Sequence, residues 1–231
     1  MTQQRIAWWA ILLPMTAVVV WSLNIVVTRY VTDFIEPMSI SFYRWLLAWL
    51  LLTPFMLHKT WQQRQLIQQH SLKLAILSAF GMLLYQGLAY SAAHYTTATN
   101  MGLINAFIPI FTIFVGILIL KEFPNRYAVI GSICSFLGLL YVLGQGQFDA
   151  ILNLGQHTGD LLMLLAVFFY AFYGVFLRKW QLALPLMLML YVQVCFALLY
   201  HVPIIVYFGL DPITQDNVLS VAYAGIFPSL L

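Results

Sequence analysis

Apolar runs long enough to cross a bilayer follow one another along almost the whole chain. They cover residues 8–30, 37–57, 72–94, 98–119, 126–144, 159–178 and 185–208, and an eighth run begins near Val218. A run of about 20 residues matches the hydrocarbon core of a bilayer, and within lipid only a helix satisfies its own backbone polar groups. Charged residues make up 7% of the chain, against about 25% in soluble domains. We therefore predict an all-α polytopic membrane protein.

The basic residues between the apolar runs predict the orientation of the chain. Eight of the ten fall in segments that would share one side of the membrane: Arg5, Lys59, Arg64, Lys73, Lys121, Arg126, Arg178 and Lys179. Because Lys and Arg are enriched in cytoplasmic segments, we place the N-terminus in the cytoplasm and the chain, as a multi-pass protein, in the cell membrane. Single basic residues scattered among apolar runs do not suggest binding of nucleic acid.

A ten-residue pattern occurs twice in the chain. WSLNIVVTRY at 21–30 and YAFYGVFLRK at 170–179 share an aromatic start, a polar fourth residue and an arginine at the ninth place. The second copy lies five runs after the first, so it has the opposite direction in the membrane. Inverted repeats are a device of secondary transporters, in which two half-structures move around a site near the midplane. The alternative is that both are unrelated helices that end in a basic residue.

Longer motifs resemble those of a known family. They are WSLNIVVTRY followed by FYRWLLAW, TTATNMGLINAFIPIFTIFVGILILKE, GSICSFLGLLYVLGQG and GDLLMLLAVFFYAFYGVFLRKW, in this order. The chain resembles the drug/metabolite transporter superfamily, in particular its branch with paired EamA domains. The resemblance implies ten helices in two inverted five-helix repeats, with a first repeat at 8–144 and a second, incomplete one at 158–231. As a member truncated at its C-terminus, the chain would hold about seven helices and part of an eighth.

Arg44 is the ionisable residue placed most clearly inside an apolar run. It lies about seven residues, or roughly 10 Å, from the outer end of the second run. A charge at that depth is costly and marks a functional candidate by default. Two roles are open: it could bind a substrate carboxylate with both arms of its guanidinium group, or extend outward to pair with Glu36 or Asp33. No carboxylate lies near the middle of a run, which disfavours a carrier of cationic drugs.

Polar and aromatic residues at similar depth predict a substrate pocket. They are Trp21, Asn24, Tyr85, Gln86, Asn105, Tyr170 and Tyr173, together with Arg44. Aromatic walls with a few amide and phenol groups suit a small zwitterion or a neutral metabolite with an apolar part. Each of these residues could instead belong to an interfacial belt or bind one helix to another.

Prolines and one acidic residue have structural interpretations. Pro14 and Pro109 lie inside apolar runs and could kink their helices, Pro109 at the better position for lining a path. Glu122 closes the fourth run, where we expect it to pair with Lys121 or Arg126.

Histidines and cysteines show no spacing for metal binding or catalysis. His94, His157 and His201 are expected near the outer interface, and Cys134 and Cys195 as buried thiols without a disulfide. The HExxH, GxSxG and GxxxxGK[ST] patterns do not occur. We therefore expect no catalytic residue, no metal site, no cofactor and no ATPase activity.

These features favour a secondary transporter that exports small metabolites, amino acids or related compounds first among them, by alternating access between two inverted repeats. Its partners would be a small-molecule substrate and the lipid bilayer, with a homodimer left open and no nucleic acid. A membrane-embedded enzyme or an accessory subunit without transport activity is the alternative. A seven-helix receptor fits the number of runs but not the repeat.

Overall fold

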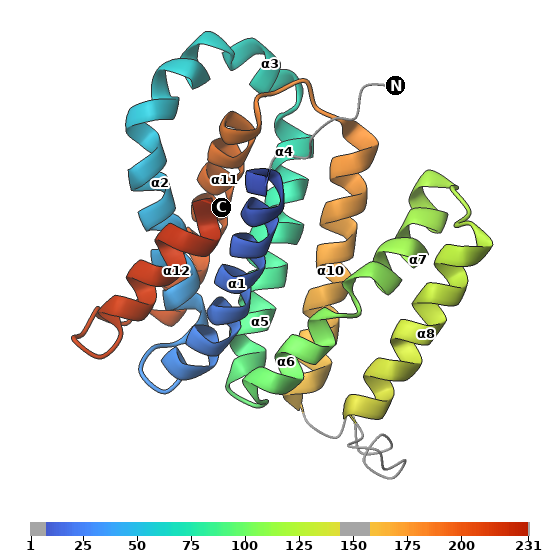
Figure 1. Cartoon of the computed structure of the whole chain (residues 1–231). Helices are drawn as coiled ribbons and strands as arrows, with labels where there is room; N and C mark the ends of the chain where they lie inside the picture. The colour runs from blue at the N-terminus through green and yellow to red at the C-terminus, as the bar shows by residue number, and fades with distance from the viewer. Residues whose placement is uncertain (1–7, 144–157, 231) are drawn as a thin grey trace.

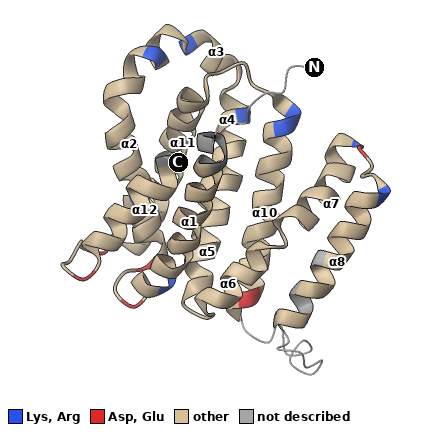
Figure 2. Cartoon of the chain, in the orientation of Figure 1, with Lys and Arg blue, Asp and Glu red and all other residues tan. Residues whose placement is uncertain are grey.

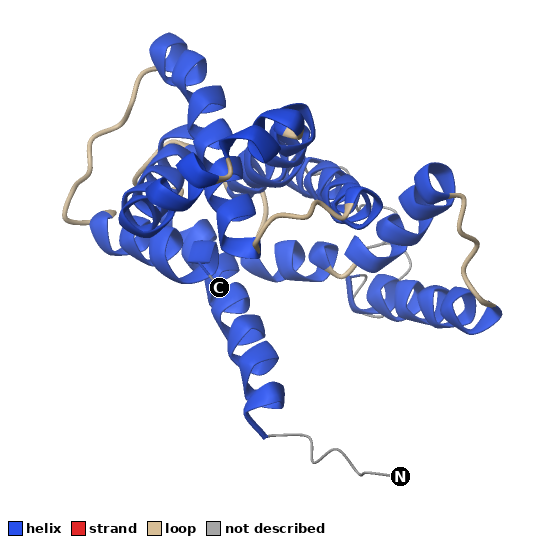
Figure 3. Ribbon diagram, turned by 90° about the horizontal axis from the view of Figure 1, so that it is seen from above, coloured by secondary structure: helices blue, strands red, loops and turns tan. Residues whose placement is uncertain are grey.

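The computed structural model describes residues 8–143 and 158–230, and these are helical with no strand among them (Figures 1 and 3). The α-helices are α1 (Trp8–Val31), α2 (Pro37–Gln62), α3 (Arg64–Gln69), α4 (Ser71–Ser78), α5 (Tyr85–Ala93), α6 (Ala98–Asn105), α7 (Ile108–Leu120), α8 (Arg126–Leu143), α10 (Thr158–Trp180), α11 (Leu186–Phe208) and α12 (Val218–Leu230). One π-helix, η1 (Ala79–Leu84), joins α4 to α5.

The helices coincide with the predicted apolar runs. Six are long and apolar enough to cross a membrane, and they lie at Pro14–Val31, Pro37–Gln62, Ser71–Ala93, Ala98–Leu120, Thr158–Trp180 and Leu186–Phe208. The third of these spans comprises α4, η1 and α5, and the fourth comprises α6 and α7. α8 and α12 correspond to the two remaining runs. The prediction of an all-α polytopic membrane protein is confirmed.

Charged residues gather at the two ends of the bundle (Figure 2). Successive spans alternate in direction, so the start of α1 and the end of α2 lie at one end (Figure 1). The basic end holds the following residues: Lys59, Arg64, Lys73, Lys121, Arg126, Arg178 and Lys179. The acidic end holds the following: Asp33, Glu36, Asp160, Asp211 and Asp216, with Arg29. Arg5 and Asp149 lie outside the described residues.

The centre of the bundle is formed by α2, α4–α5, α10 and α11. α10 packs between α5 and α7, α11 packs against α2 and α4, and α12 lies across α2 and α1. α8 contacts mainly α6 and α7, with which it stands at one edge (Figure 1). Large apolar side chains such as Phe55, Val206 and Tyr207 are 70–81% exposed in the chain, as expected where lipid rather than water covers the surface.

The segment after α11 fastens that helix to the start of α2. The Asp211 carboxylate accepts a hydrogen bond from the Glu36 backbone N–H at 2.7 Å, and the Asp211 N–H donates to Ser39 Oγ at 3.0 Å. The carboxylate thus occupies the N-terminus of α2, whose first N–H groups have no partner within the helix. Gly209, with φ +89°, allows the chain to leave α11 toward this site.

His201 lies inside the α2–α11 contact rather than at an interface. It is fully buried, with Nδ1 2.7 Å from the Ala197 carbonyl oxygen and Nε2 2.9 Å from Ser41 Oγ. A carbonyl oxygen only accepts hydrogen bonds, so Nδ1 carries a proton. The expectation of an interfacial position is wrong for His201, and the expectation of burial is wrong for Cys134, which is exposed. Whether each side chain is buried or exposed depends on the face of the helix on which it lies, and the spacing of residues in the sequence does not predict that face.

Candidate substrate site

Arg44 is buried between α2, α5 and α12, with 3% of its surface exposed. Its Nε donates to Ser229 Oγ at 2.8 Å, and its Nη1 donates to Gln86 Oε1 at 3.2 Å and Tyr90 OH at 3.4 Å. All three acceptors are neutral groups. Tyr90 and Ser229 are the members of this site that sequence reasoning missed, since a single Tyr or Ser in an apolar helix gives no signal.

The remaining contacts of Arg44 are also neutral. Nη2 donates to the Pro228 carbonyl oxygen at 3.4 Å, and the guanidinium carbon lies 5.0 Å from the centre of the Trp45 ring. The two ion pairs among the described residues are Arg29–Asp33 and Arg178–Glu122, so neither involves Arg44. Pairing of Arg44 with Glu36 or Asp33 is therefore wrong.

The consequence is a buried positive charge without a carboxylate partner in the described chain. Hydrogen bonds to neutral groups orient the guanidinium group but leave its charge uncompensated, and a buried charge is costly unless an opposite charge accompanies it. An anionic group that enters between α2, α5 and α12 would find donors held in place and a charge that it could neutralise.

Three tyrosines form a cluster beside the Arg44 site, and we call Tyr85, Tyr170 and Tyr173 the aromatic cluster. The ring centres of Tyr85 and Tyr170 are 4.5 Å apart, and those of Tyr170 and Tyr173 are 5.6 Å apart. The Tyr85 hydroxyl donates to Asn105 Oδ1 at 3.4 Å. Four of the predicted pocket residues are thus brought together from α5, α6 and α10. Gln86, next to Tyr85 in the chain, links this cluster to Arg44.

The π-helix η1 shapes the approach to the aromatic cluster. Its wider turn displaces the backbone, and such turns are frequent at functional sites. The Met82 carbonyl oxygen in η1 accepts a hydrogen bond from Trp45 Nε1 at 3.2 Å. At Gly81 a Cβ atom would lie 2.7 Å from Cδ2 of Tyr173, so only glycine lets the ring rest on the backbone here. Nothing in the sequence pattern predicts this π-helix.

The fourth span is interrupted next to Asn105. α6 ends at Asn105 and α7 begins at Ile108, and the Ala106 and Phe107 N–H groups bond to the Leu103 and Ile104 carbonyl oxygens in a tightened last turn. Pro109 lies in the first turn of α7, where its missing N–H leaves no gap in the helix. Of the two prolines for which a kink was expected, Pro109 directly follows the interruption of its span, whereas α1 continues as one helix through Pro14.

Trp21 and Asn24 lie on α1 and stand apart from these clusters. Trp21 is 50% exposed, and the structure gives it no contact with Arg44 or the aromatic cluster. Asn24 is half-buried, and its Oδ1 is buried without a hydrogen-bond partner. Ile25 packs on the hydrophobic core that also includes Tyr85. Asn24 therefore presents a free acceptor on a helix that borders the site, while the role of Trp21 stays a prediction.

Asp160 is a buried carboxylate, whereas sequence reasoning predicted only that it lies toward the outer face. It is 1% exposed in the first turn of α10, and its Oδ1 accepts hydrogen bonds from Thr96 Oγ1 and Asn100 Nδ2. The backbone of Thr96 lies so close to Gly159 that a Cβ would approach its nitrogen to 2.7 Å. This contact fastens the start of α10 to the turn between α5 and α6.

The opposite end of α10 is held by exposed groups. Arg178 Nη2 lies 2.6 Å from Glu122 Oε2, and Lys179 Nζ donates to the Ile119 carbonyl oxygen at 3.4 Å. Glu122 therefore pairs across to α10, and the expected pairing with Lys121 or Arg126 is wrong. Lys121 adopts a left-handed conformation, φ 57°, that ends α7.

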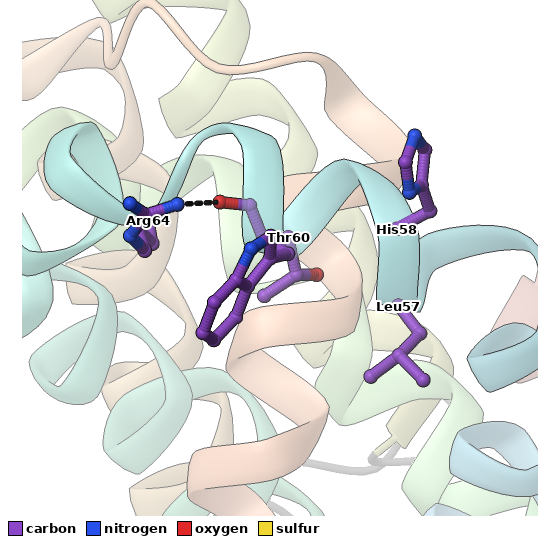
Figure 4. Close-up of a pocket in the computed structure, with 5 residues that line it drawn as sticks. Leu57, His58, Thr60 and Arg64 are labelled. Carbon is purple, nitrogen blue, oxygen red and sulfur yellow. Dashed lines mark hydrogen bonds between the residues drawn. The ribbon is translucent and has the colours of Figure 1, made fainter.

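Two surface hollows lie at the ends of the bundle, away from the Arg44 site. The larger, of about 500 Å³ at the basic end, is lined by Leu57, His58, Thr60, Trp61 and Arg64 (Figure 4). There Arg64 Nη1 donates to the Trp61 carbonyl oxygen at 3.1 Å. The smaller, of about 280 Å³ at the acidic end, is lined by Glu36, Pro37, Ser91, His94 and Tyr95. Neither hollow is lined by Arg44 or by a residue of the aromatic cluster.

The described residues form a helical membrane bundle in which Arg44 is buried between the spans. The model of the EamA-like transporter family matches residues 8–144 and 157–231. The chain belongs to this family, which confirms the resemblance drawn from the motifs.

Curated relatives carry the same general description. The chain is 23% identical over 209 residues to the "Uncharacterized transporter YyaM" of Bacillus subtilis, covering 88% of this chain and 68% of the relative. An "Uncharacterized transporter" of Archaeoglobus fulgidus is 26% identical over 168 residues, covering 71% of this chain and 55% of the relative. One of Methanothermobacter thermautotrophicus is 24% identical over 175 residues, covering 71% and 51%. No solved structure matches the chain.

Proposed function

We propose that this protein is a secondary transporter of small metabolites that carry a carboxylate, amino acids first among them. The observation that carries the proposal is Arg44: a guanidinium group 3% exposed, held by Gln86, Tyr90 and Ser229, and without a carboxylate partner in the described chain. A permanent acidic partner would neutralise the charge. Its absence leaves the guanidinium group free to exchange an anionic cargo.

The aromatic cluster offers a surface for the apolar part of such a cargo. Tyr85, Tyr170 and Tyr173 offer ring faces for an apolar part, while Asn105 and Gln86 offer amide groups. Pockets with mostly apolar walls and a few fixed polar groups are typical of small-molecule sites. A carboxylate at Arg44 and a side chain at the aromatic cluster would together position an amino acid.

Alternating access between inverted repeats is the proposed mechanism, and the helix contacts support it. In the proposed repeat, α1 corresponds to α10, α2 to α11, and the span α4–α5 to α12. The contact of α1 with α12 therefore corresponds to that of α10 with α5, and the contact of α2 with α12 corresponds to that of α11 with α4. The α2–α11 contact maps onto itself. These pairs pack together in the structure and fit an axis in the membrane plane, whereas the α2–α5 contact has no counterpart of similar extent between α11 and α12. We propose 8–144 and 158–231 as the two repeats.

The proposed orientation places the basic end in the cytoplasm of the cell membrane. Lys and Arg gather at the ends of α2, α7 and α10 and at the starts of α4 and α8, whereas the opposite end is acidic (Figure 2). This distribution follows the positive-inside rule. Cargo would move from the basic end toward the acidic end during export.

Counterflow in proteoliposomes tests the function. Vesicles loaded with an unlabelled mixture of amino acids should take up a labelled member of that mixture faster than protein-free vesicles. Arg44→Met serves as the matched inactive variant and Arg64→Met, at an exposed arginine of the basic end, as the control that stays active. If no member of the panel exchanges in vesicles that contain correctly folded protein, amino-acid transport is ruled out.

A further inference from the structure

Gln193 is a buried amide with an unused acceptor. It lies on α11, is 1% exposed, and its Oε1 has no hydrogen-bond partner among the described residues. Buried polar groups in membrane spans are almost always paired, and an unpaired one calls for an explanation. No sequence pattern singles out this residue, because a lone Gln in an apolar helix is typical of helix–helix contacts.

The surroundings of Gln193 connect it to the proposed cargo path. Its side chain lies beside the Tyr173 hydroxyl, and its backbone carbonyl accepts a hydrogen bond from Ser78 Oγ at 2.7 Å. Tyr173 in turn stacks on Tyr170 and rests on Gly81. Gln193 therefore continues the line of polar groups from Arg44 through the aromatic cluster, on the side of the basic end.

The helix register shows how far this residue lies from Arg44. Arg44 is the seventh residue after Pro37, where α2 begins at the acidic end, and Gln193 is the seventh after Leu186, where α11 begins at the basic end. The Thr53–Tyr191 and Ser41–His201 hydrogen bonds place Arg44 level with residues 198–200 of α11, so at about 1.5 Å per residue the two groups are separated by roughly 8–10 Å along the helix axes. Counted from Pro37 and Pro185, which each precede a tyrosine by six residues, Gln193 lies one residue further along its span than Arg44.

We propose that Gln193 forms a second substrate contact, in which its Oε1 accepts a hydrogen bond from the ammonium group of an amino-acid cargo. This inference rests on the proposed function and adds the cargo's amine to it. The cargo contacts Gln193 on the side of the basic end and Arg44 on the side of the acidic end.

The chemistry of the site favours a cationic donor at this position. An amide oxygen is an acceptor, and the neighbouring Tyr173 and Tyr170 rings add faces that attract an ammonium group. The contact therefore distinguishes an amino acid from its 2-hydroxy analogue, which has the same carboxylate and side chain but no positive charge.

Transport competition with three variants tests this inference. The best amino acid of the counterflow panel competes with its own 2-hydroxy analogue in vesicles that contain the wild type, Gln193→Met, Gln193→Glu or Ser78→Ala. We expect the preference for the amino acid to fall about tenfold in Gln193→Met, from the loss of one acceptor, and to persist in Gln193→Glu. Ser78→Ala removes the neighbouring hydroxyl that bonds to the Gln193 backbone and should keep the preference.

The outcomes separate this inference from the function on which it rests. An unchanged preference in Gln193→Met, or an equal loss in Ser78→Ala, would show that Gln193 acts only in packing α11 and would overturn the second contact. Absence of counterflow in the wild type would instead contradict the transport function itself. Gln193→Glu, which keeps an oxygen acceptor at this position, gives a second readout if Gln193→Met does not fold.

Discussion

Arg44 Nη1 lies 3.2 Å from Gln86 Oε1, and this hydrogen bond connects the one buried arginine of the described chain to the helix that carries Tyr85. Because Tyr85 and Gln86 are consecutive, they point to different sides of α5: one to the aromatic cluster and the other to the guanidinium group. In the proposed site, a cargo that neutralises Arg44 would lie next to ring faces that can cover its apolar part.

Gly81→Ala should disrupt the aromatic cluster. The added Cβ would lie 2.7 Å from the Tyr173 ring, and overpacking of this kind costs about 1–3 kcal/mol. We expect a lower melting temperature in detergent and reduced counterflow. Gly116→Ala is the matched control, because nothing lies within 4 Å of a Cβ there. Equal behaviour of the two variants would contradict the close packing of Tyr173 on η1.

The ring of Tyr85 should matter more than its hydroxyl. Tyr85→Ala removes a ring whose centre lies 4.5 Å from that of Tyr170, whereas Tyr85→Phe loses only a 3.4 Å hydrogen bond to Asn105. We expect a loss of roughly tenfold in transport for alanine and less than about threefold for phenylalanine, in line with the size of single aromatic and hydrogen-bond contributions. Tyr207→Ala, at an 81% exposed residue, should transport normally. A larger loss for phenylalanine than for alanine would contradict this order.

Asp160 should stabilise the docking of α10. Asp160→Ala leaves the Thr96 hydroxyl and the Asn100 amide without their acceptor in a buried position. Loss of such a bond costs about 1–3 kcal/mol, which thermal unfolding of the purified protein would detect. Asp216→Ala, at an exposed carboxylate, is the control. Equal melting temperatures for the two variants would show that the Asp160 contact is not needed for the fold.

The orientation can be measured by cysteine labelling. After Cys134 and Cys195 are replaced by alanine, Gln65→Cys lies at the basic end and Asp216→Cys at the acidic end. A membrane-impermeant maleimide should label position 216 on intact cells and position 65 only after permeabilisation. The reverse pattern would invert the proposed topology.

Sequence reasoning predicted the spans well, because a run such as 37–57 must be helical in lipid whatever its neighbours are. It named Pro109 as a place where the fourth span could kink, and the span is interrupted just before that residue. It could not predict which faces meet: the burial of His201, the exposure of Cys134 and the partner of Glu122 depend on helix rotation and on contacts between distant spans. For the same reason Tyr90, Ser229 and Gln193 were missed, as each is an isolated polar residue whose meaning depends on its neighbours in space.

The role of Arg44 is the central claim, and competition between an amino acid and its uncharged amide in counterflow tests it most directly. Arg44→Met should lose the preference of the wild type for the carboxylate by roughly 10- to 100-fold, the range for hydrogen bonds to a charged group, while Arg64→Met keeps it. A folded Arg44→Met protein that prefers the carboxylate as strongly as the wild type does would contradict the proposed site.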